Sequence, residues 1–173
     1  MAKITKPAVG DYAPYFQNYI NQVPDDGNLL KHLKEIQKET EQLILSLPEE
    51  KLTYRYAEGK WTIKDILVHL MDAERIFAYR ALRFARADET ALAGFDENVY
   101  VPVANANARK IKDILKEGTA LRTANIAFIK TLDRKSLKRK GLSNNNKISV
   151  AALVNLIYGH QRHHLNIIRE RYL

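Results

Sequence analysis

Hydrophobic residues recur along this chain with the spacing of amphipathic helices. Four segments keep a period near 3.6 residues, which places their apolar side chains on one face of a helix. These segments cover residues 27–47, 62–87, 107–132 and 149–170. The two-residue alternation of half-buried strands is almost absent. The pattern therefore predicts an all-α protein folded as a four-helix bundle.

Punctuating residues mark the ends of these helices. Pro48 stops the first helix, and Thr62 with Asp65 has the spacing of a capping box before the second. Ser149 is a favourable N-cap for the last helix. Between the second and third helices, "DETALAGFDENVYVPVANAN" has no sustained period and predicts a long loop. Loops of this length within a domain are often functional.

The N-terminal region differs from the rest of the chain. Residues 1–26 contain prolines and a glycine without periodicity, so we expect an extended arm that packs on a single bundle domain at 27–173. Its aromatic residues are the expected anchors on the bundle: Tyr12, Tyr15, Phe16 and Tyr19.

The amino-acid composition limits the possible metal ligands and the expected location of the protein. The 173 residues include no cysteine, so any metal must be held by nitrogen or oxygen, and a cytoplasmic location is expected. Neither an apolar stretch long enough to span a membrane nor the apolar core of a signal peptide occurs in the sequence.

The net charge of +8 raises the possibility of a nucleic-acid or membrane-surface partner. Much of the excess lies in "KTLDRKSLKRKGL", residues 130–142, in which no aromatic residues interleave with the charges. We therefore expect a solvated basic connection and neither a nucleic-acid nor a membrane partner.

The ending "YGHQRHHLNIIRERYL" holds three of the five histidines. At 100° per residue, His160 and His164 lie on the apolar stripe of the last helix, whereas His163 falls roughly 80° to one side. A shared divalent metal would satisfy both buried imidazoles. Core histidines with hydrogen-bond partners, or a solvated helix end, remain alternatives. His69, at the edge of the second helix's apolar stripe, is a third possible ligand or a surface histidine.

Three stretches together resemble the DinB/YfiT-like superfamily: "KWTIKDILVHLMDAERIFAYR", "LAGFDENVYV" and "GHQRHHLNIIRERYL". The resemblance runs from about residue 28 to the end. It implies a four-helix bundle, commonly dimeric, in which His69, His160 and His164 hold a divalent metal and His163 does not. Three nitrogen ligands suit Zn²⁺ or Ni²⁺, with Fe²⁺ or Mn²⁺ as alternatives.

The resemblance also implies a class of activity. The superfamily includes S-transferases that use low-molecular-weight thiols and members described as metal-dependent hydrolases, so we expect a metal centre that activates water or a thiol toward a small-molecule substrate. A non-catalytic metal-binding stress or resistance protein is the alternative. Asp96 and Glu97 in the long loop are candidate catalytic carboxylates, although loop carboxylates are often simply solvated. On the second helix, Asp72 could assist His69, and Glu74 is expected to pair with a neighbouring arginine.

Overall fold

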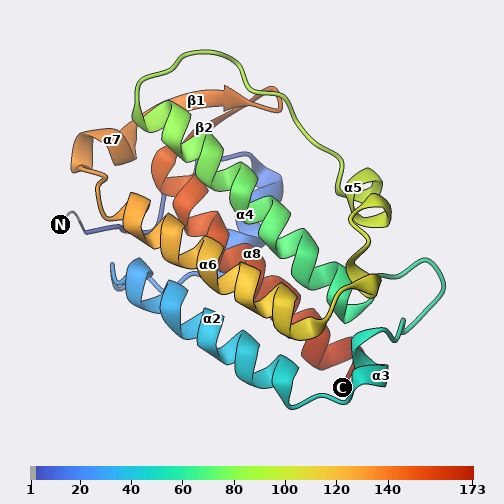
Figure 1. Cartoon of the computed structure of the whole chain (residues 1–173). Coiled ribbons are helices and arrows are strands. Elements are labelled where there is room, and N and C mark those ends of the chain that lie inside the picture. The colour runs from blue at the N-terminus through green and yellow to red at the C-terminus, as the bar shows by residue number, and fades with distance from the viewer. Residues whose placement is uncertain (1–2) are drawn as a thin grey trace.

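Four long helices form the framework of the protein, in a computed structural model that describes residues 3–173 (Figure 1). They are α2 (Leu29–Leu45), α4 (Ile63–Ala85), α6 (Ile111–Ile129) and α8 (Val150–Arg171). Helix α8 packs against α4 and α2, and α6 packs against the same two helices. The predicted four-helix bundle is confirmed, with each predicted helix end within four residues of the observed one.

The predicted caps explain where two helices begin. The Thr62 hydroxyl accepts a hydrogen bond from the Asp65 amide, and the Asp65 carboxylate accepts one from the Thr62 amide, which completes the capping box of α4. The Ser149 hydroxyl accepts from the Ala152 amide at the start of α8. These bonds satisfy amides that lack an intrahelical partner.

Short elements interrupt the connections that were predicted to be loops. They are α3 (Glu49–Leu52), α5 (Glu97–Val103), the 3-10 helix η2 (Ala106–Ala108), α7 (Arg134–Lys138) and the antiparallel strands β1 (Lys140–Ser143) and β2 (Asn146–Ser149). Each is too short to establish a hydrophobic period. The strands meet in a two-residue turn in which Asn144 and Asn145 both have positive φ, as a tight hairpin requires.

The described part of the N-terminal arm, residues 3–26, lies against the bundle, but it is not extended throughout. It contains η1 (Pro14–Phe16) and α1 (Gln17–Asn21), and α1 packs on α8. Pro14 opens this helical segment, as its fixed φ allows. A methyl group at Gly159 would overlap the backbone carbonyl of Tyr19, so the arm packs tightly against α8 at Gly159.

The apolar core occupies the space between the long helices. Fully enclosed side chains include Leu33, Ile36, Leu153 and Leu156. The segment that follows α4 runs back along this helix, so that α5 lies beside its N-terminal half (Figure 1). Within residues 3–173, none of the helices is both long and apolar enough to cross a membrane.

Two helical glycines give a matched test of how the arm docks. We expect Gly159→Ala to lower the free energy of unfolding, because overpacking against backbone typically costs about 1–3 kcal/mol and outweighs the better helix propensity of alanine. Gly118→Ala is the control, since its methyl group would sit 3.6 Å from the Met71 sulfur, an ordinary contact. It should gain up to about 1 kcal/mol. Chemical denaturation followed by circular dichroism measures both, and equal gains would contradict the docking.

Candidate metal centre

Three buried histidines converge between α4 and α8. His69 comes from α4, and His160 and His164 come from successive turns of α8. The Nε2 atom of His160 lies 3.1 Å from the Nε2 atoms of both His69 and His164. One ligand atom from each of the three lies within 4.8 Å of the others. Two segments far apart in the sequence thus present three ring nitrogens to one point.

The spacing of these nitrogens fits a small divalent ion. Tetrahedral Zn²⁺ with nitrogen ligands at 2.0–2.1 Å places neighbouring nitrogens roughly 3.3 Å apart, close to the two separations of 3.1 Å seen here. Three nitrogens packed this closely repel one another unless protons or a cation lie between them. The arrangement can therefore hold a metal ion with little movement of the rings.

Burial sets the protonation state of the three rings. It lowers the pKa of His69 to about 4, and burial, followed by the neighbouring His69 and His163, lowers the pKa of His164 to about 3. The pKa of His160 lies well below its ordinary value, first because of burial and then because of the other histidines. All three imidazoles are thus neutral at pH 7, which is the form that binds metals.

Aromatic rings enclose the histidines on the side of the arm. The Trp61 ring lies 4.8 Å from the His69 ring and is stacked at 6.3 Å on the His164 ring, measured between centroids. The Tyr19 ring meets the His160 ring edge-on at 5.3 Å. Trp61 is half-buried: its ring packs against the apolar core and also lies over the rings of His69 and His164.

The half-buried His163 lies outside this cluster, in contact with the Tyr19 ring at 5.0 Å. This position at the edge of the cluster agrees with the helical angle of His163, which places it roughly 80° to one side of His160 and His164. His69 is more enclosed than its edge position suggested, with 6% of its surface exposed, because α8 covers that edge of α4.

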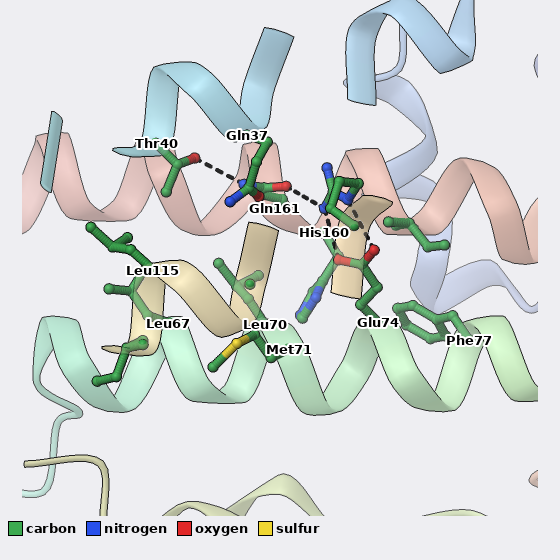
Figure 2. A pocket seen from close by; sticks show the side chains of 14 residues that line it. Gln37, Thr40, Leu67, Leu70, Met71, Glu74, Phe77, Leu115, His160 and Gln161 are labelled. Atoms are coloured by element: carbon green, nitrogen blue, oxygen red, sulfur yellow. Dashed lines mark hydrogen bonds and ion pairs between the residues drawn. The ribbon is translucent and has the colours of Figure 1, made fainter. Parts of the chain in front are cut away.

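Behind the histidines, a buried polar network joins all four long helices. Arg122 of α6 donates to both carboxylate oxygens of Glu74, at 2.8 and 2.9 Å, and to the side-chain oxygen Oε1 of Gln161 at 2.6 Å. Gln161 in turn donates to the Thr40 hydroxyl. Thr40, Glu74, His160 and Gln161 line a small cavity of about 40 Å³, in which Thr40 lies on the far side of Gln161 from His160 (Figure 2). The predicted pairing of Glu74 with an arginine is confirmed.

On the side facing away from this polar network, the histidines open into a larger pocket of about 370 Å³. Its lining includes His69, His160, His164 and the candidate catalytic residue Glu97. The other candidate, Asp96, is exposed and does not line this pocket, because its carboxylate caps α5 by accepting from the Asn98 amide. Asp72 lies 3.5 Å from Arg75 on the helix surface and is occupied there rather than at His69.

The burial of two arginines near the centre was not predicted from the sequence, because long charged side chains are ordinarily exposed to solvent. Arg122 and Arg80 are both buried. The available signal for Arg80 was its spacing, since it follows His69 by eleven residues, three helical turns, and therefore shares its face.

The buried Nδ1 atom of His164 has no hydrogen-bond partner among residues 3–173.

Comparisons with known proteins agree with this architecture. The sequence model described as "DinB superfamily" matches residues 32–168. The Oceanobacillus iheyensis protein named "Putative metal-dependent hydrolase OB0413" is 29% identical over 143 residues, which is 79% of this chain and 81% of that protein.

The chain is also similar over nearly its whole length to a solved structure. "YfiT from Bacillus subtilis", described as "a probable metal-dependent hydrolase with an unusual four-helix bundle topology", superposes with a TM-score of 0.77 at 19% identity. The match covers 98% of this chain and 95% of that one. At this identity the likeness establishes the fold.

Metal binding should be visible in thermal stability. An ion that binds only the folded protein stabilises it by about 2.7 kcal/mol at a hundredfold excess over Kd. We expect Zn²⁺ or Ni²⁺ to raise the melting temperature of the wild type, and this rise should disappear in His69→Ala and His160→Ala because each removes a ligand. His163→Ala, at the rim, should keep the rise. Equal rises in all four proteins would contradict the centre, and elemental analysis gives the stoichiometry.

Proposed function

This chain belongs to the DinB superfamily, and from that premise we propose that it is a hydrolase dependent on a divalent metal held by His69, His160 and His164. One observation carries the proposal: three neutral imidazole nitrogens from two separate segments meet at the end of an open pocket. The name of the relative OB0413 and the description of YfiT give additional support.

The ligand set favours catalysis over storage. Among residues 3–173, no further histidine or carboxylate joins the three histidines to close a coordination shell. A divalent ion bound there would supply a Lewis acid that lowers the pKa of a coordinated water toward neutrality. Neutral nitrogen ligands suit Zn²⁺ or Ni²⁺, with Fe²⁺ and Mn²⁺ as alternatives.

The surrounding residues would position a small-molecule substrate and move its protons. The rings of Trp61 and Tyr19 line the pocket beside the histidines and would contact the substrate. Glu97 lines the pocket, and we assign it the role of accepting a proton from the attacking nucleophile. Asp96 would act indirectly, because its cap fixes the start of α5, the helix that carries Glu97.

The same centre could instead activate a low-molecular-weight thiol, which would make the protein an S-transferase. A non-catalytic metal-binding protein is the other alternative, and the open coordination shell argues against it.

We also propose that the protein is a cytoplasmic homodimer. The lack of cysteine supports the cytoplasmic location, and the dimers of the superfamily support the oligomeric state. Light scattering at micromolar concentration tests the dimer.

A hydrolysis screen tests the proposed reaction. Small esters and amides should be hydrolysed by the metal-loaded protein, chelation should abolish turnover, and added metal should restore it. We expect Glu97→Gln to lower kcat by about 10²–10⁴-fold at unchanged metal content, because a general base contributes that much. Asp96→Asn, the matched carboxylate, should have the smaller effect.

Other outcomes would decide against this proposal. Turnover that survives chelation would contradict the metal-dependent mechanism. Conjugation of a thiol to an electrophile without hydrolysis would indicate the S-transferase. Stoichiometric metal without either reaction would favour the non-catalytic protein.

A further inference from the structure

Arg80 is a buried cation in the wall of the histidine pocket. Only 7% of its surface is exposed, and its guanidinium donates one hydrogen bond, of 2.8 Å, to the Ala93 carbonyl. Among residues 3–173 it forms no ion pair, whereas Arg75 and Arg83 on the same helix both bind carboxylates at the surface. A buried charge without a counterion is costly, and a bound anion would offset that cost.

The helix geometry places Arg80 at the far end of the pocket from the histidines. His69, Ala73, Phe77 and Arg80 all line the pocket, at successive spacings of four, four and three residues along one face of α4. Eleven residues of α-helix correspond to roughly 16 Å along the axis. The pocket is therefore elongated, with an apolar floor between a group of metal-binding residues and a cation.

The two ends of this pocket differ in charge. Glu97 lines the pocket toward the histidine end, because α5, which carries it, lies beside the N-terminal half of α4. At the opposite end, burial raises the pKa of Tyr15, while a hydrogen bond with Asn144 and the charge of Arg80 partly offset that rise. The two charged side chains of the pocket, Glu97 and Arg80, thus lie toward opposite ends of it.

The groups around Arg80 resemble a receptor for an anion. The Phe95 ring lies 5.9 Å from the guanidinium carbon, and Tyr15 and Asn144 line the same part of the pocket. A guanidinium presents five N–H donors in a planar fork that matches a carboxylate or a phosphate. Because one bond to Ala93 uses only part of this capacity, donors remain for a ligand.

We propose that Arg80 binds a carboxylate or phosphate group of an elongated substrate, whose scissile bond then lies at the histidines. The inference rests on the proposed function, because it concerns the same pocket. The apolar floor of Ala73 and Phe77 would contact an aliphatic or aromatic middle section of the substrate. The anionic group would provide the counterion that Arg80 lacks, and it would fix the distance of the reacting bond from the metal ligands.

Three probes of similar shape test the anion site: 4-phenylbutyrate, 3-phenylpropyl phosphate and the neutral 4-phenylbutyramide. Trp61, the single tryptophan, lines the pocket and reports binding by its fluorescence. We expect the metal-loaded wild type to bind at least one anion at least tenfold more tightly than the amide. The stronger of the two anions identifies the substrate group as carboxylate or phosphate.

The variants separate binding by Arg80 from a structural role. Arg80→Met should abolish the preference for anions, whereas Arg80→Lys should retain part of it. Arg83→Met, which removes an arginine of the same helix, should leave the preference unchanged. Unaltered preference in Arg80→Met would overturn the proposal, as would equal binding of anion and amide, or no binding of any probe, in the wild type. A uniform loss of all three probes in both Arg80 variants would show that Arg80 only supports the loop through Ala93, and would also overturn it.

His160→Ala distinguishes this proposal from the proposed function. If the anion preference persists in His160→Ala and is lost in Arg80→Met, the anion site exists whether or not the protein hydrolyses anything. If the preference is lost in His160→Ala and retained in Arg80→Met, the anion binds at the histidine centre, and the proposal for Arg80 fails. An intact preference in a protein without hydrolytic activity would leave Arg80 as an anion site and refute only the hydrolase.

Discussion

The buried pairing of Arg122 with Glu74 holds the centre of the molecule together. One guanidinium joins α6 to α4 through both oxygens of Glu74, to α8 through Gln161 and to α2 through the Leu33 carbonyl. Removing one partner of such a pair leaves an uncompensated charge in the core and typically costs about 3–5 kcal/mol. The network therefore fixes the relative positions of α4 and α8, the two helices that carry the histidines.

Burial has opposite consequences for the histidines and for Arg80. It keeps the imidazoles neutral, since their pKa values lie far enough below 7 to lose the proton. An arginine cannot respond in this way, because its guanidinium stays protonated in proteins. The low-polarity interior thus creates uncharged ligands at one end of the pocket and retains a cation at the other. Both features arise from the packing of one face of α4.

Most of the features that were predicted from the sequence follow from helical periodicity and other local patterns. The four long helices, the caps at Thr62 and Ser149, and the shared face of His160 and His164 all depend on contacts within a few residues. Convergence of His69 on that pair depends on the packing of α4 against α8, which local patterns do not specify. The resemblance to the DinB/YfiT-like superfamily, rather than any local pattern, indicated that His69 joins His160 and His164.

What the sequence failed to predict depends on long-range contacts or on very short elements. The burial of Arg80 and Arg122 follows from partners on other segments, such as Ala93 and Glu74. The β1–β2 hairpin depends on two consecutive asparagines at positive φ, a signal that the turn-rich composition only partly revealed. The α1 helix in the arm is stabilised by its contact with α8 rather than by its own periodicity.

The docking of the arm also bears on the order in which the molecule assembles. Asn155 of α8 donates to the Thr5 carbonyl across 150 residues, and Tyr19 covers His160 at nearly the same separation. Closing so long a loop is entropically unfavourable until the helices have packed. Contact order therefore favours the packing of α4 on α8, which joins His69 to His160 across 91 residues, before Tyr19 of the arm docks on His160.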